Sequence, residues 1–208
     1  MRYIDEEPFL ERMKNEKGIV LFDEGRSLCY ETDDFHGFDF TNLTNPHKGD
    51  ESVVERVFAD ERGIERAMIE TLLNLMGELD QFPVRLIPVD DDWADDELES
   101  LIAKNYVTPE EGAVLTKVVE DGKALSAVEI DADEIVAGVC LTLPQLTLRS
   151  TVCAVIGGDG ATLALVSRDE EVSFNTTDRA LYEKARALMK ARAASLPFEV
   201  VWVDDIVA

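Results

Sequence analysis

The sequence predicts an α+β fold built from two similar helix-strand-strand-helix-strand halves, packed with a pseudo-twofold relation. Two near-repeats indicate this arrangement. Residues 24–28 (EGRSL) and 159–163 (DGATL) each lie between apolar runs, as the turn of a β-hairpin does. Residues 83–91 align without a gap on residues 197–205, and both segments run from a proline through mainly apolar residues to an Asp-Asp pair. A mostly antiparallel sheet with a helical middle segment follows, although such elements also succeed one another without duplication.

The first half is expected to span residues 1–92. Asp5 can accept hydrogen bonds from the first backbone amides of a helix, and Gly18 can end that helix. The short apolar runs 19–22 and 28–31 then predict the two strands of a hairpin, because turn residues separate them.

An insertion over residues 32–60 distinguishes the first half from the second. The turn glycine precedes the strand proline by 58 positions in the first half and by 37 in the second, so the first half carries about 21 extra residues. Helical periodicity returns over residues 62–80, and a strand over 84–89 follows. The apolar residues at this helical spacing are Ile64, Met68, Leu72, Leu75, Met76 and Leu79.

Residues 93–129 are expected to form a helical connector. Apolar residues at positions 98, 101 and 102 mark one helix, and a capping-box pattern at 108–111 (TPEE) begins another. The second half spans residues 130–208. Its apolar residues over 135–143 keep helical spacing, which favours a helix over the strand that the β-branched members would also permit.

Strands over residues 146–156 and 162–167, a helix over 178–194 and a strand over 198–203 complete the second half. The halves can be two small domains or one compact domain overall, since 208 residues suffice for either. The helices over 62–80 and 178–194 are expected to cover one side of the sheet. The residues expected in the core are Leu21, Leu28, Met68, Leu72, Leu86, Val155, Leu163, Leu188, Val201 and Val203.

Acidic residues dominate the composition. Forty-four acids against 20 bases give a net charge of −24 and a pI near 4.3. Nucleic acids and anionic membranes both attract Lys and Arg, so we expect neither as a partner. A basic protein is the partner that this charge favours; alternatively, the acid only supports solubility in a salty or acidic habitat. Without a long apolar run or a signal-peptide pattern, a cytoplasmic location is expected.

Both histidines, His36 and His47, lie in the insertion near Asp34 and Asp39. Imidazole and carboxylate groups suit a metal site or acid–base catalysis near neutral pH. Eleven positions separate the two histidines, and no helix or strand geometry brings them together at that spacing. The other interpretation is that they are ordinary surface residues of a loop.

Three phenylalanines of the insertion, Phe35, Phe38 and Phe40, alternate with polar residues. Exposed aromatic side chains are typical anchors for a protein partner. Alternatively, the segment folds inward as an edge strand or as a lid over the core.

The second candidate partner surface is an acidic run around Trp93. It comprises Asp90, Asp91, Asp92, Asp95 and Asp96. The run lacks the ligand spacing of a calcium-binding EF-hand loop, and acid before a helix also offsets the positive end of the helix dipole. The glycines at 157–160 join two expected strands, so they indicate a turn and not a phosphate-binding loop.

The leading hypothesis is a non-catalytic, acidic, cytoplasmic binding or adaptor protein, without a cofactor, that acts as a monomer or homodimer and engages a basic protein. The rival hypothesis is a metal-assisted enzyme with its site at His36, His47, Asp34 and Asp39. A third is a protein whose acidity reflects only its habitat. The three cysteines lie in apolar stretches and are expected to be core residues.

Overall fold

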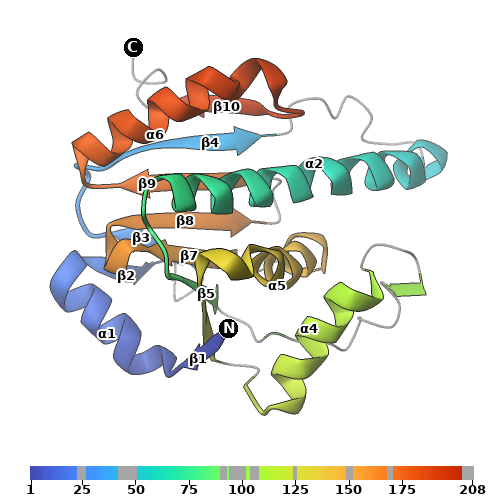
Figure 1. The fold of residues 1–208 in the computed structure, drawn as a ribbon, viewed down its shortest axis with the longest axis horizontal. Coiled ribbons are helices and arrows are strands. Elements are labelled where there is room, and N and C mark those ends of the chain that lie inside the picture. Colours follow the sequence, from blue (N-terminus) through green and yellow to red (C-terminus); the bar gives the residue numbers. More distant parts are fainter. Residues whose placement is uncertain are drawn as a thin grey trace.

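An eight-stranded antiparallel sheet is the centre of the fold in the part of the chain that the structure describes (Figure 1). The structure is a computed structural model that describes residues 1–22, 27–41, 51–89, 93, 102–103, 108–123, 126–148, 152–167 and 171–202. From one edge to the other, the strands are β1 (Arg2–Ile4), β6 (Ala127–Ile130), β5 (Val84–Val89), β7 (Val152–Gly157), β8 (Thr162–Ser167), β9 (Glu171–Thr176), β4 (His36–Thr41) and β10 (Glu199–Trp202). A separate hairpin consists of β2 (Ile19–Phe22) and β3 (Ser27–Tyr30).

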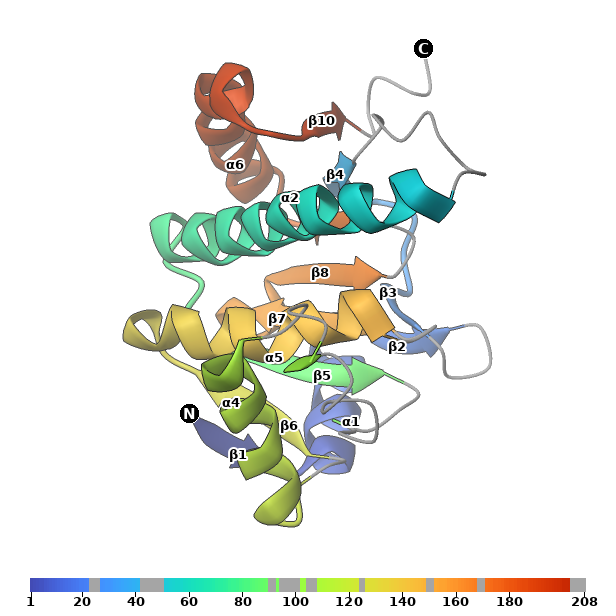
Figure 2. The same cartoon turned by 90° about the vertical axis from the view of Figure 1, so that its right-hand side faces the viewer.

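Helices cover the two faces of the sheet unequally (Figure 2). The front face, which is turned toward the viewer in Figure 1, carries α2 (Glu51–Glu78), α5 (Ile135–Leu148) and α6 (Arg179–Arg192). Helix α4 (Pro109–Glu120) packs against α5. The back face carries α1 (Glu6–Lys17) and the β2–β3 hairpin. Short 3-10 turns are η2 (Ala132–Glu134), η3 (Gly158–Gly160) and η4 (Ala193–Ser195). None of the helices in the described ranges is both long and apolar enough to span a membrane.

Two hydrophobic cores lie on opposite faces of the sheet. The larger core joins the front face to α2, α4, α5 and α6, and its members include Phe38, Phe40, Leu72, Leu86, Phe174 and Met189. The smaller core joins the back face to α1 and the hairpin, and its members include Phe9, Met13, Ile19, Leu28, Ile87 and Ile156. Because successive side chains of a strand point to opposite faces, central strands such as β5 are apolar at nearly every position.

The predicted mixture of helices and mainly antiparallel sheet is confirmed, and so is the helix over residues 135–143. The strand expected from residue 146 is wrong at its start, because α5 continues past Pro144 to Leu148. Proline removes one helical hydrogen bond, but α5 is packed along α2 and the sheet, and that packing outweighs the loss. The strands β1, β6 and β9 were not predicted.

The predicted core is mostly confirmed, with one clear correction. Leu21 was expected to be buried, but its side chain is 55% exposed. Ile19 is buried, and Leu21 lies two residues nearer the turn, where the small back core ends. Leu188 and Val201 are partly buried, and Val203 lies outside the described residues.

The pseudo-twofold relation between the halves is not confirmed. The first hairpin, β2–β3, forms its own sheet, whereas the second, β7–β8, lies in the middle of the large sheet. Strands from residues 1–92 and 130–208 alternate in that sheet, since β4 lies between β9 and β10. The insertion therefore supplies a strand that is integral to the sheet.

Candidate functional site

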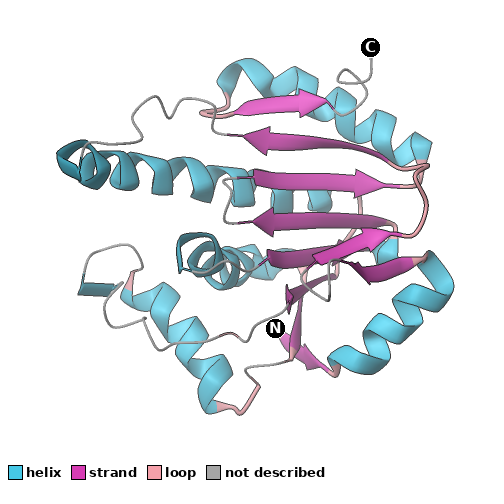
Figure 3. Cartoon of the chain, turned by 180° about the vertical axis from the view of Figure 1, so that it is seen from behind, coloured by secondary structure: helices cyan, strands magenta, loops and turns pink. Residues whose placement is uncertain are grey.

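The back of the sheet is covered over only part of its width (Figure 3). The core residues beneath α1 and the hairpin come from β6, β5, β7 and β8, and the last of them is Leu163. No residue of β9, β4 or β10 belongs to that core in the described chain. Figure 3 shows these three strands facing the viewer without a helix in front of them. We call this area the open face.

Polar and small residues line the open face. On the front, β9 and β4 present Val172, Phe174, Phe38 and Phe40, each at most 1% exposed. The alternate positions on the back are more polar, as is usual for an antiparallel sheet with one solvated face. Neighbouring strands align these back positions in rows across the sheet. The residues of the open face are Ser173, Asn175, Gly37, Asp39, Thr41, Val201 and Glu199.

A close fit across β9 and β4 fixes the polar groups of the open face. A Cβ atom on Gly37 would lie 2.4 Å from Oδ1 of Asn175, so the glycine leaves room for that amide. Nδ2 of Asn175 donates to Oγ of Ser173 at 3.2 Å, and Oγ also accepts from the backbone N–H of Leu165 at 3.2 Å. These two hydrogen bonds and the space left by Gly37 hold both polar side chains in place on the open face.

An exposed acidic loop leads into the open face. Glu31, Asp33, Asp34 and Phe35 are all exposed, and β4 begins at the next residue. Phe35 is 38% exposed. We call these four residues the acidic loop. It places three exposed carboxylates and one aromatic ring next to the start of β4, which is one of the strands of the open face.

The aromatic and tryptophan candidates are mostly buried. Phe38 and Phe40 are 0% exposed, so the expectation that they anchor a partner is wrong. The alternative that the segment folds inward holds, although β4 lies between β9 and β10 and is not an edge strand. Trp93 is also 0% exposed, and its Nε1 donates to the carbonyl oxygen of Ser126 at 2.8 Å. These rings fill the front core because it is the largest apolar volume available to them. Of these candidates, Phe35 keeps an exposed ring.

The candidate metal ligands do not come together in the described residues. The His36 ring stacks on the Tyr182 ring of α6, with centroids 5.3 Å apart, on the front of the sheet. Asp39, three positions along β4, lies on the back, because alternate residues of a strand face opposite ways. Asp34 lies in the acidic loop. Across the described ranges, no group of three or more His, Cys, Asp or Glu side chains is arranged to hold a metal ion.

Six of the candidate site residues lie outside the described residues: His47, Asp90, Asp91, Asp92, Asp95 and Asp96.

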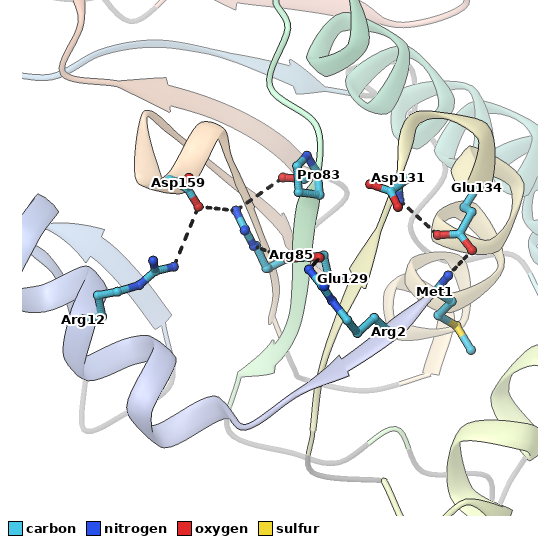
Figure 4. Close-up of polar contacts among 9 residues, drawn as sticks. All are labelled: Met1, Arg2, Arg12, Pro83, Arg85, Glu129, Asp131, Glu134 and Asp159. Carbon is cyan, nitrogen blue, oxygen red and sulfur yellow. Dashed lines mark hydrogen bonds and ion pairs between the residues drawn. The ribbon is translucent and has the colours of Figure 1, made fainter.

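A charged cluster on the covered half of the back face was not predicted (Figure 4). Arg85 of β5 donates from Nε to Oε2 of Glu129 at 2.9 Å, and Arg2 of β1 contacts the same carboxylate. Nη1 of Arg85 lies 2.9 Å from Oδ1 of Asp159, and Nη2 of Arg12 lies 3.8 Å from that oxygen. The signal in the sequence was an arginine inside the apolar strand 84–89, since a buried arginine needs a carboxylate partner.

Burial disfavours the reactive form of all three cysteines. It raises the pKa of Cys153 to about 12, and it raises the pKa values of Cys29 and Cys140 as well. A thiol with a raised pKa carries little thiolate at neutral pH, so it is a weak nucleophile and a weak metal ligand.

Comparisons with protein-family models, curated proteins and solved structures find no match to this chain.

Proposed function

We propose that this protein is a non-catalytic binding or adaptor protein that engages a basic protein through the open face and the acidic loop. The observation that carries the proposal is the chemistry of the open face: its seven residues include carboxylates and no Lys or Arg. The acidic loop adds three exposed carboxylates beside it. A partner with Lys and Arg side chains complements both.

The charge of the whole chain supports the same partner. A net charge of −24 attracts a basic protein from beyond contact distance, which raises the association rate more than the final affinity. Screening limits this attraction to about 8 Å at physiological salt, so the residues near the contact decide where the partner docks.

Phe35 supplies an aromatic side chain to this surface. An aromatic ring at an interface contributes more binding energy than most rim charges do. At 38% exposure, the Phe35 ring is held by the protein but remains accessible. Its position between the acidic residues and β4 places it where a docked partner would cover it.

The metal-enzyme alternative has less support. It needs His36 and Asp39 in one site, and the described strand β4 directs them to opposite faces of the sheet. The habitat alternative makes a distinct prediction: every acidic patch would then be equivalent for binding.

The test is a comparison of two charge-reversed proteins by capture from an extract of the native host. One carries Asp33→Lys and Asp34→Lys in the acidic loop. The control carries Glu7→Lys and Glu11→Lys on α1, which are also exposed and change the net charge equally. We expect the wild type and the control to retain one basic protein, and the loop variant to lose it.

Binding of that protein should weaken as sodium chloride is raised, and Phe35→Ala should weaken it by about tenfold, as expected when an aromatic anchor is lost. Equal loss from both charge-reversed proteins would favour the habitat interpretation. Retention by both would contradict the proposed docking surface.

A further inference from the structure

Two carboxylates link three guanidinium groups on the covered half of the back face (Figure 4). Arg2 and Arg85 contact Glu129, and Arg12 and Arg85 contact Asp159. Three positive groups against two negative groups give the cluster a charge of +1, in a chain with a net charge of −24.

The two guanidinium groups beside Asp159 are held in position from behind. The Cζ atom of Arg12 lies 5.6 Å from the centre of the Phe9 ring, and the Cζ atom of Arg85 lies 5.7 Å from the same centre. Glu129 fixes Nε of Arg85, whose side chain is only 9% exposed. An anion that binds here meets donors that are already ordered, which lowers the entropy cost of binding.

Asp159 holds the place of an anion between these donors, with Oδ1 at 2.9 Å from Nη1 of Arg85. Its side chain is 66% exposed, and the contact from Arg12 at 3.8 Å is too long for a hydrogen bond. The backbone φ is 53° at Asp159, between Gly158 at 54° and Gly160 at 90°. Aspartate adopts this left-handed conformation more readily than most residues, and its carboxylate can rotate about χ1 without a change in the backbone φ.

We propose that Arg12 and Arg85 form an anion site that takes a phosphate group in place of the Asp159 carboxylate. Without Asp159, the cluster has three guanidinium groups and one carboxylate, a charge of +2. This charge matches the dianion of a phosphate monoester at neutral pH. A phosphate also offers more acceptor oxygens to the two guanidinium groups, which both contact Oδ1 of Asp159. The site lies apart from the open face and does not depend on the basic partner.

Calorimetric titration of the full chain with inorganic phosphate tests this site. Sodium chloride holds the ionic strength constant, and acetate is titrated in parallel as a carboxylate probe. Asp159→Asn removes the internal competitor, and Arg12→Gln removes one donor from the protein surface. Lys14→Gln is the control, because it removes one exposed positive charge from the same helix.

We expect phosphate to bind Asp159→Asn about tenfold more tightly than the wild type, because a tethered carboxylate competes at a high effective concentration. Arg12→Gln should weaken binding by about tenfold, as the loss of one charge-assisted contact does, and Lys14→Gln by less than about twofold. The proposal is overturned if Asp159→Asn binds phosphate no more tightly than the wild type. It is also overturned if Arg12→Gln and Lys14→Gln behave alike, or if acetate binds as tightly as phosphate.

Discussion

Replacing either member of the Arg85–Glu129 ion pair alone should destabilise the protein far more than replacing both. The pair joins β5 to β6 on the back face, and the side chains of Arg85 and Glu129 are 9% and 6% exposed. Removing one partner from a buried pair leaves the other charge in a medium that solvates it poorly. Replacing both partners with apolar residues removes that penalty.

The structure sets the expected size of each effect. Glu129→Leu leaves Arg85 with Asp159, which is 66% exposed, and Arg85→Met leaves Glu129 with Arg2, which is 73% exposed. Because each remaining charge keeps a second, solvent-exposed partner, we expect each single substitution to cost about 3 kcal/mol, the lower end for a broken buried pair. The double variant should lie within about 1 kcal/mol of the wild type, so the coupling energy is about 5 kcal/mol.

Urea unfolding measures these differences in the free energy of unfolding. Tryptophan fluorescence reports the loss of the front core, because Trp93 is fully buried in it and Trp202 packs against it. The control is Glu78→Gln, because Glu78 pairs with Arg192 at 2.5 Å on the surface and should cost under about 1 kcal/mol. A double variant destabilised by the sum of the two single values would refute the reasoning, since the charges would then act independently.

Three further measurements test other parts of the fold. Gly63→Ala should raise the free energy of unfolding by about 0.5–1 kcal/mol, because the glycine is inside α2 and a Cβ atom there meets nothing within 4 Å. Gly37→Ala should lower it by about 2 kcal/mol or more, because its Cβ atom would lie 2.5 Å from a backbone oxygen of β9. Equal melting temperatures for these two alanine variants would contradict the difference in space around the two glycines. At pH 8 a thiol reagent should modify Cys153 more slowly than the partly exposed Cys29, because Cys153 is buried and its pKa is about 12. Faster labelling of Cys153 would mean that its strand opens readily. Burial and a hydrogen bond to the Asp121 carboxylate raise the pKa of Tyr3 to about 12 from an ordinary value of 10.0. The contribution of neutral Tyr3 to stability is therefore complete below pH 10 and should fall as the pH rises from 10 to 12. Urea midpoints that stay constant over that range would exclude this contribution.

Local patterns in the sequence predicted most of the helices and the hairpins. The helical spacing from Ile64 to Leu79 and the short apolar runs around turn residues are local signals, and the structure places a helix and strands there. Strand β1 has only three residues, so no periodicity can mark it, and it is defined by its pairing with β6. Such long-range pairing has no local signature.

The candidate sites were harder to predict, because a side chain's direction depends on which strands are neighbours. Phe38 and Phe40 were expected on a surface or at an edge, but β4 joins the sheet between β9 and β10, which lie at least 130 residues later in the chain. That placement buries both rings and sends Asp39 to the open face. Arg85, by contrast, was marked in the sequence by its apolar neighbours.

The position of β4 also has a consequence for the order in which the protein is made. His36 of β4 pairs with Thr176 of β9, so 140 residues of chain must be synthesised between the two partners. At about 5–20 residues per second, the interval is roughly 7–28 s. During that time the apolar side of β4, with Phe38 and Phe40, lacks both of the strands that flank it in the folded protein. A nascent chain of this protein therefore exposes an apolar, aromatic segment for several seconds before its partner strands exist. Chaperones bind exposed hydrophobic segments of this kind.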